Sequence, residues 1–215
     1  MTISTLYQKY RIPPNLARHQ IEVAAVGEWV ADHWKGPKLD RVALRQVLLL
    51  HDMGNIVKFK KPFLGELAQN SAYWEKVQQE FQSKYGMNAH EATESIIKEI
   101  GVSEAVLRIV SEMGTIAMGT AKGKKSWEAR IADFADTCVS PEGIVGFEKR
   151  VEDLKKRYNI AEDDQKVKVW KKNKEMVQKY TILTLDELPI NFLIKNQTFS
   201  ADFSETFSLS DGEKE

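Results

Sequence analysis

The sequence predicts an all-α protein, and three observations support this prediction. Apolar residues recur at intervals of three and four along most of the chain, which is the spacing of an amphipathic helix. Residues that commonly begin or end helices stand at the boundaries of these stretches. Stretches with the alternating pattern of a β-strand are scarce. We therefore expect a helical bundle followed by a charged C-terminal helical extension and a flexible acidic tail.

The first two predicted helices each carry a histidine in the apolar stripe. Pro13-Pro14-Asn15 is typical of a helix start, and Lys35-Gly36-Pro37 ends this helix. Its stripe contains Leu16, His19, Val23, Val26 and Val30. Asp40 can cap the next helix, which ends near Gly54. The stripe of that helix contains Leu44, Val47, Leu48 and His51.

The middle of the chain predicts further helices. One runs from about Glu66 to Tyr85, after a basic loop at residues 55–65. Asn88 with Glu91 three residues later resembles a capping box and begins another helix, which Gly101 ends. The remaining predictions are a helix capped by Ser103, a Gly- and Lys-rich loop at 114–125, a helix with Trp127, Ile131, Phe134 and Cys138, and a turn at 141–143.

Two charged helices are predicted after that turn, at residues 145–158 and at about 162–180. From Thr181 onwards the chain becomes acidic, with seven acidic residues against two lysines, and its last dozen residues have the composition of a disordered tail. We therefore divide the chain into a domain at residues 1–158 and an extension with its tail at residues 159–215.

Composition limits the classes of function. The chain has 215 residues with 31 Lys+Arg and 31 Asp+Glu, so its formal net charge is zero. Neither general nucleic-acid binding nor binding to an anionic membrane is expected without a basic excess. The single cysteine, Cys138, excludes an internal disulfide framework and suits a reducing cytoplasm. We see no secretory signal and no apolar run near the roughly 20 residues of a membrane-spanning helix, so we expect a cytoplasmic protein.

Metal-capable side chains stand on three of the predicted helices. His19 and His51 lie in apolar stripes, Asp52 follows His51 directly, and Asp136 lies near the end of a later helix. Imidazole nitrogen and carboxylate oxygen suit a first-row divalent metal. Taken singly, each histidine is more often a hydrogen-bonded core residue than a ligand. Helical phase also leaves Asp133 as a candidate equal to Asp136.

The order of these residues resembles the HD-domain superfamily of metal-dependent phosphohydrolases. The matching segments are NLARHQIEVAAVGEWVA, VLLLHDMGN, NAHEATESIIKEIG and WEARIADFADTCV, which lie within residues 10–158. The resemblance implies an HD-domain helical bundle in which His19, His51, Asp52 and Asp136 bind a metal. The Ala-Asp pair in DFADTCV matches the family block and so favours Asp136 over Asp133.

The resemblance also implies the chemistry. A single divalent ion (Mn, Fe, Co, Ni or Zn, with Mg as a further candidate) would activate a water molecule for hydrolysis of a phosphate ester. Asp52 would also be catalytic, because it can orient or deprotonate that water. The expected substrate is a small phosphorylated compound, such as a nucleotide.

Other residues are assigned to the substrate or to the rim. His90 lies in the first turn of the helix capped by Asn88, where free N–H groups and the helix dipole suit phosphate, and it stands where many family members carry a third histidine. Asn55 and Lys58 are the other expected substrate-binding residues. Rim lysines are also predicted, and the candidates besides Lys58 are Lys60, Lys61, Lys122, Lys124 and Lys125. His33 is interpreted as structural or exposed.

Departures from the family pattern keep alternatives open. Two-metal members usually carry a further histidine where this chain reads RIVSEMG, so Glu112 is at most a second-metal or supporting ligand. Asn55 replaces the Lys, Glu or His of several subfamilies. These departures motivate a second hypothesis, a metal- or nucleotide-binding regulatory module with little or no turnover. A third, oxidative chemistry at a di-iron centre, needs more histidines than the chain provides at matching positions. The sequence does not indicate an oligomeric state.

Overall fold

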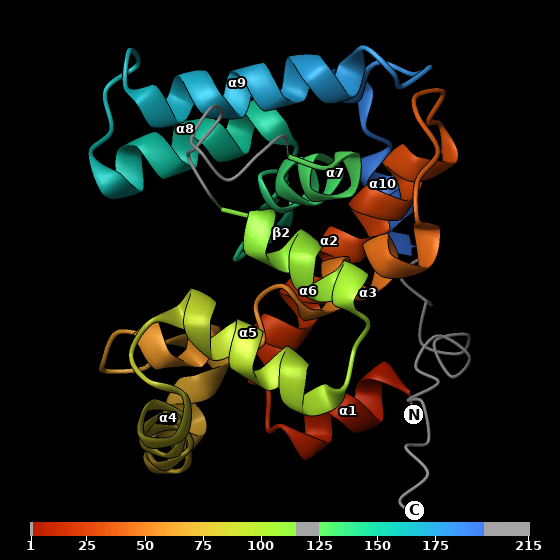
Figure 1. Ribbon diagram of the computed structural model, residues 1–215. Helices are drawn as coiled ribbons and strands as arrows, with labels where there is room; N and C mark the ends of the chain where they lie inside the picture. The colour runs from red at the N-terminus through yellow and green to blue at the C-terminus, as the bar shows by residue number, and fades with distance from the viewer. Residues whose placement is uncertain (1, 115–124, 196–215) are drawn as a thin grey trace, which may run out of the picture.

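The structure of the protein is a computed structural model that describes residues 2–114 and 125–195. Within these ranges the fold is an all-α bundle with one short β-hairpin, as the sequence predicts. Figure 1 shows α8 and α9 along one side of the bundle and α1, α4 and α5 at the opposite end, with α2, α3 and α7 between them. Among the described residues, no helix is long and apolar enough to cross a membrane.

The centre of the bundle is α2 (Pro14–Asp32), which packs most extensively against α3 (Arg41–Leu50) and α7 (Trp127–Asp136). Pro14 occupies the first turn of α2, and Asp40 caps α3 by accepting a hydrogen bond from Ala43 N–H. A Cβ added to Gly27 would lie 2.5 Å from the side chain of Leu48, so this glycine permits the close approach of α2 and α3.

The turn after α3 packs against α5 (Ala89–Ile100). It leads into the 3₁₀ helix η1 (Asn55–Lys58). A Cβ added to Gly54 would lie 2.5 Å from Thr93 N, a backbone atom of α5. Asn88 caps α5 by accepting from His90 N–H and Glu91 N–H, and Gly101 ends it in the left-handed conformation, as the sequence predicts. Together these features fix the turn that carries His51 and Asp52.

Two parts of the N-terminal half differ from the sequence prediction. The segment expected to form one helix from about Glu66 divides into the 3₁₀ helix η2 (Gly65–Asn70) and α4 (Ser71–Tyr85), because the backbone of Asn70 leaves the helical conformation at φ −130°. A helix that the sequence analysis did not anticipate, α1 (Ile3–Lys9), packs its Tyr7 on α3 through a hydrogen bond from the hydroxyl to Leu49 O at 2.6 Å.

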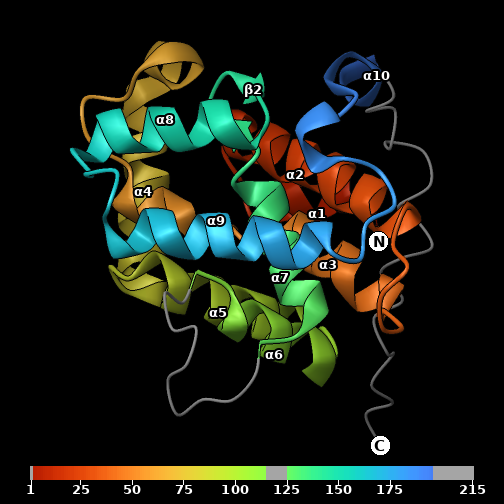
Figure 2. The ribbon, with the colours of Figure 1, turned by 90° about the horizontal axis from the view of Figure 1, so that it is seen from above.

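The C-terminal half follows α6 (Glu104–Glu112) and α7. The strands β1 (Val139–Ser140) and β2 (Gly143–Ile144) form an antiparallel hairpin at the predicted turn, and Val139 pairs with Ile144. Next come α8 (Phe147–Tyr158), α9 (Gln165–Gln178), η3 (Leu185–Glu187) and α10 (Ile190–Lys195). Figure 2 shows α8 and α9 side by side over the bundle, and Lys174 pairs with Glu148 at 2.7 Å between them.

The extension is held to the bundle by polar and aromatic contacts. Asn173 of α9 donates to Arg130 O of α7 at 2.9 Å. Trp34, Trp127 and Tyr180 form a cluster with ring centroids 4.9 to 5.5 Å apart. The division at residue 158 stays a prediction. The last dozen residues, predicted to be disordered, lie outside the described residues, as do most of the predicted loop at 114–125 and its Lys122 and Lys124.

Candidate metal centre

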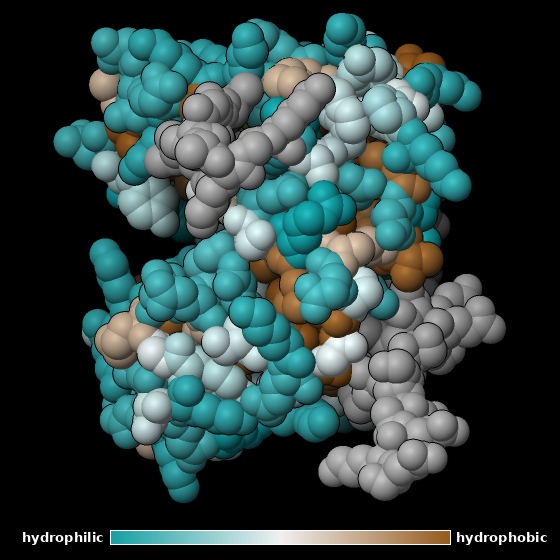
Figure 3. Space-filling view, viewed as in Figure 1, coloured by the Kyte–Doolittle hydropathy of each residue, from teal (hydrophilic) through white to brown (hydrophobic). Residues whose placement is uncertain are grey.

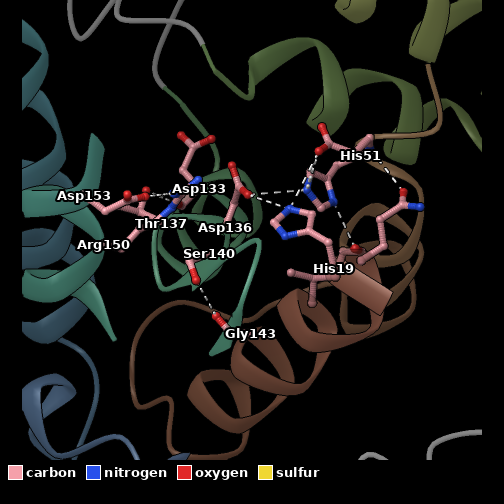
Figure 4. Close-up of polar contacts among 12 residues, drawn as sticks. His19, His51, Asp133, Asp136, Thr137, Ser140, Gly143, Arg150 and Asp153 are labelled. Atoms are coloured by element: carbon pink, nitrogen blue, oxygen red, sulfur yellow. Dashed lines mark hydrogen bonds and ion pairs between the residues drawn. The ribbon is translucent and has the colours of Figure 1, made fainter. Parts of the chain in front are cut away.

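The four predicted ligands meet at one place in the bundle, although the chain separates the first from the last by more than a hundred residues. His19 Nε2 lies 3.0 Å from Asp136 Oδ1 and 3.7 Å from Asp52 Oδ2. His51 Nε2 lies 3.7 Å from Asp136 Oδ1 and 3.9 Å from Asp52 Oδ2. Figure 4 shows the imidazoles of His19 and His51 and the carboxylate of Asp136 pointing toward one another.

Close packing of α2 and α7 brings His19 to Asp136. His19 lies in the second turn of α2, and Asp136 is the last residue of α7. The small residues Ala129 and Ala132 of α7 are fully buried. Small side chains let helices approach closely, so the two ligands meet where the helices pack. Asp136 keeps 45% of its side-chain surface exposed, whereas His51 keeps 4%.

The end of α3 orients His51. The last carbonyl groups of a helix have no partner within the helix. Here Leu49 O accepts from the Tyr7 hydroxyl and Leu48 O accepts from His51 Nδ1 at 3.0 Å. A carbonyl can only accept, so Nδ1 carries a proton and Nε2 faces the other three ligands, where it can offer its lone pair once it is deprotonated. Nε2 is buried and has no hydrogen-bond partner among the described residues.

The backbone after His51 is held by two side chains. Asp52 N–H donates to Oε1 of the buried Gln20, from α2, at 3.2 Å. Gly54 N–H donates to Thr93 Oγ1, from α5, at 2.9 Å. The turn is thus tied to two different helices, and the position of the Asp52 carboxylate depends on both.

The electrostatics of the cluster also suit a cation. Burial lowers the pKa of His51, but the negative charges of Asp52 and Asp136 outweigh it and raise the pKa to about 9. Burial raises the pKa of Asp136, but the hydrogen bond with His19 and the charges of both histidines hold it well below its usual range. Without a metal the two carboxylates therefore keep a positive charge on His51.

The donor set fits a divalent metal. Ligand atoms of His19, His51 and Asp52 all lie within 4.8 Å of one another, and Asp136 Oδ1 approaches both histidines. Two nitrogen and two oxygen donors suit a first-row transition metal and leave coordination positions for water and substrate. Such an ion would take the place of the Nε2 proton of His51 and would give this buried, unpartnered atom a ligand bond.

A cavity of about 900 Å³ opens beside this centre. Three of the four ligands line it, namely His19, Asp52 and Asp136, and so do Asn55 and Lys58. The opposite part of the wall comes from the hairpin and α8. In the space-filling view the outline of the molecule is indented at the left edge, between α8 above and the segment around residues 59–65 below (Figure 3). This volume is within the range of sites for small organic ligands.

Other predicted residues occupy different positions. Asp133 pairs with Lys125 and accepts from Gly114 N–H at 3.1 Å, so the structure places Asp136 and not Asp133 at the histidines. His33 ends α2 and contacts Trp29 O at 2.8 Å through Nδ1. Lys60 and Lys61 are exposed, and Lys61 pairs with Glu75 at 3.6 Å.

His90 and Glu112 are not among the residues that line the cavity. His90 lies in the first turn of α5 and pairs with Glu94 at 3.3 Å. Glu112 accepts from the backbone N–H of Ser126 at 2.8 Å and from its hydroxyl, and so supports the start of α7. Contact of His90 with substrate and a ligand role for Glu112 remain predictions.

Three arginines of the cavity wall were not singled out from the sequence: Arg18, Arg150 and Arg157. Arg18 directly precedes His19, and Arg150 and Arg157 stand seven residues apart on α8. A seven-residue interval places two side chains on the same face of a helix, so this spacing was the available signal. The sequence alone does not show which face of α8 meets the cavity.

Comparison with known proteins gives one match. The family model described as HD domain matches residues 16–139, from the start of α2 to the start of the hairpin. No curated protein and no solved structure matches the chain.

Proposed function

Because the chain belongs to the HD-domain family, whose members are generally metal-dependent hydrolases, we propose that it is a phosphohydrolase. Its substrate would be a phosphomonoester or phosphodiester of a nucleotide or of another small phosphorylated metabolite. The observation that carries the proposal is the buried, unpartnered Nε2 of His51, which faces three further ligand atoms beside a cavity of nucleotide size.

His19, His51, Asp52 and Asp136 would hold one divalent ion, with Mn, Fe, Co, Ni, Zn and Mg as the candidates. Such an ion, when bound, polarises a phosphoryl oxygen and makes a bound water more acidic. The hydrogen bond from His51 Nδ1 to Leu48 O fixes the direction of this ligand before binding. The hydrogen bond from Asp52 N–H to Gln20 Oε1 likewise fixes the turn that carries Asp52 before the metal binds.

Asp52 has two tasks in the proposed reaction. One carboxylate oxygen lies 3.7 to 3.9 Å from both histidine nitrogens, which suits a ligand to the same ion. The other can accept a proton from the attacking water and orient it toward the phosphorus. Asn55 and Lys58 line the same cavity. The Lys58 ammonium, for which no ion pair is found within the described ranges, would hold phosphoryl oxygens.

The test combines metal analysis of the purified protein with a panel of phosphoesters assayed with each candidate metal. We expect a divalent-dependent activity that His51→Ala and Asp52→Ala abolish while the circular dichroism spectrum stays that of a folded helical protein. His33→Ala is the matched control, because it removes a histidine that does not line the cavity. Full activity in either ligand variant would refute the proposed centre.

One observation favours a second candidate, a metal- or nucleotide-binding regulatory module without turnover. Asn55 presents a neutral amide at the cavity wall, where several subfamilies carry a Lys, Glu or His. Tight binding of metal and nucleotide, with no product from any phosphoester under any metal condition, would support this module and exclude the hydrolase.

A further inference from the structure

Helix α8 brings a pair of arginines to the cavity. Arg150 and Arg157 line it together with His19, Asp52 and Asp136. Both arginines lie beyond the part of the chain that matches the HD-domain model. Figure 4 shows Arg150 and its partner Asp153 on the α8 side of Asp136. The cavity therefore has a metal-binding wall and, separately, a wall with guanidinium groups.

The two guanidiniums are held in place by one carboxylate. Asp153 pairs with Arg150, which lies three residues before it. It also pairs with Arg157, four residues after it, at 3.0 Å. Glu142 also lines this part of the cavity, so Asp153 is the carboxylate that holds the two arginines and Glu142 is a second one near them. Only 14% of the Arg150 side chain is exposed, and its Nε is buried without a hydrogen-bond partner among the described residues. Arginine donors that are covered to this degree normally have acceptors, so Arg150 retains unused donor capacity.

A single phosphoryl group at the metal would already be matched by the metal and by Lys58 on η1. Arg150 and Arg157 belong to another wall, and a planar guanidinium suits the paired oxygens of a phosphate. The cavity, at about 900 Å³, has room for more than one phosphoryl group. We propose that α8 forms a second phosphate subsite, in which Arg150 and Arg157 select substrates that carry a phosphoryl group besides the one cleaved.

This inference rests on the proposed function and narrows its substrate class to compounds of nucleotide size with two or more phosphoryl groups. In this arrangement Asp153 is a positioning residue, because it contacts both arginines and does not line the cavity. The pair acts on binding and specificity, while hydrolysis depends on the metal ligands.

Calorimetry measures the dissociation constants of three probes: adenosine 5′-monophosphate, adenosine 5′-diphosphate and adenosine 3′,5′-bisphosphate. Each probe is measured once with Mn²⁺ and once with EDTA, which removes the metal and so prevents turnover. The readout is the ratio of the monophosphate constant to that of the better diphosphorylated probe. We expect a ratio of about ten or more in the wild-type protein, the equivalent of one charge-assisted hydrogen bond. Arg150→Gln and Arg157→Gln should each lower it several-fold.

Matched controls stand on the same helix. Lys149→Gln and Lys156→Gln remove equal charge from exposed residues that do not line the cavity, so the ratio should stay within twofold of wild type. Arg150→Lys keeps the charge and loses the fork of donors, so it should lower the ratio as well. Thermal melts monitor folding of the Arg150 variants, and the more exposed Arg157 provides a test that does not depend on a covered side chain.

Equal affinity for all three probes in the wild-type protein would overturn the second subsite. The second subsite would also be overturned if the Arg157→Gln and Arg150→Lys variants kept the same ratio of dissociation constants as the Lys149→Gln and Lys156→Gln controls. Both outcomes are separate from failure of the proposed function, because a protein that hydrolyses no phosphoester can still show the ratio in EDTA. If the protein hydrolyses phosphoesters but binds the monophosphate and the diphosphorylated probes equally, the proposed function stands and the second subsite is refuted.

Discussion

Replacing Gln20 by leucine tests how the turn that carries the metal ligands is held. Gln20 is fully buried on α2, and its Oε1 accepts from Asp52 N–H at 3.2 Å. Its amide Nε2 is buried and has no hydrogen-bond partner among the residues that the structure describes. Leucine is similar in size and apolar, so the change removes the acceptor for Asp52 and, at the same time, a buried donor without a partner.

The two effects on stability oppose each other. Loss of the hydrogen bond costs about 1 kcal/mol, and removal of the buried unsatisfied amide returns a similar amount. The free energy of unfolding of the metal-free protein should therefore change by less than about 1 kcal/mol. The metal site has no such compensation, because the backbone N–H of Asp52 loses the group that orients it. Removal of an outer partner of a metal ligand typically lowers metal affinity by about 10- to 100-fold.

Competition with a chromophoric chelator measures the metal affinity, and urea denaturation in EDTA measures the stability. The expected result is a large loss of affinity beside a small change in stability. The Gln20→Glu variant keeps an acceptor for Asp52 N–H and should lose less affinity than the leucine variant. A Gln20→Leu protein that is folded and binds Mn²⁺ or Zn²⁺ within twofold of wild type would refute the reasoning.

Three further predictions concern neighbouring features. Gly54→Ala places a Cβ 2.5 Å from Thr93 N, a backbone atom that cannot move alone, so thermal denaturation should show a loss of about 1–3 kcal/mol; an unchanged melting temperature would contradict the close packing. Metal affinity should rise by up to about tenfold per pH unit and level off above about pH 9, because the metal must displace the proton of His51, whose pKa is raised to about 9. Calorimetry in buffers of different ionisation enthalpy would detect the released proton, and a metal affinity that stays constant between pH 7 and 9 would contradict this prediction. Glu112→Ala removes the acceptor for the N–H and hydroxyl of Ser126 and should lower the melting temperature while metal stoichiometry stays at one per chain; loss of a second metal equivalent would instead identify Glu112 as a ligand.

Local signals in the sequence were sufficient for most helices and for their ends. Asp40, Asn88 and Ser103 cap the helices that they were expected to cap, because capping depends on hydrogen bonds within a few residues. The two errors in helix prediction also come from relying on local signals. Residues 3–9 have too few positions to show a helical period, and the irregular backbone at Asn70 divides a segment whose apolar spacing continues through it.

The candidate site was predicted less evenly. Order along the chain and the family resemblance identified His19, His51, Asp52 and Asp136, and their atoms meet in the structure. Periodicity could not separate Asp133 from Asp136, because both are compatible with the same face of α7. Packing of α7 on α2 decides between them, since it directs Asp136 to the histidines and leaves Asp133 with Lys125.

What the sequence by itself determined is most of the helices, the types of ligand and the class of chemistry that such ligands support, because propensity, capping and donor identity are properties of short segments. The tertiary structure decided which side chains share the cavity. It tied Asp52 to Gln20, left the Nε2 of His51 buried without a partner among the described residues, and turned Arg150 and Arg157 toward the metal-binding wall. These relations join residues far apart in the chain, and only the packing of one helix on another creates them.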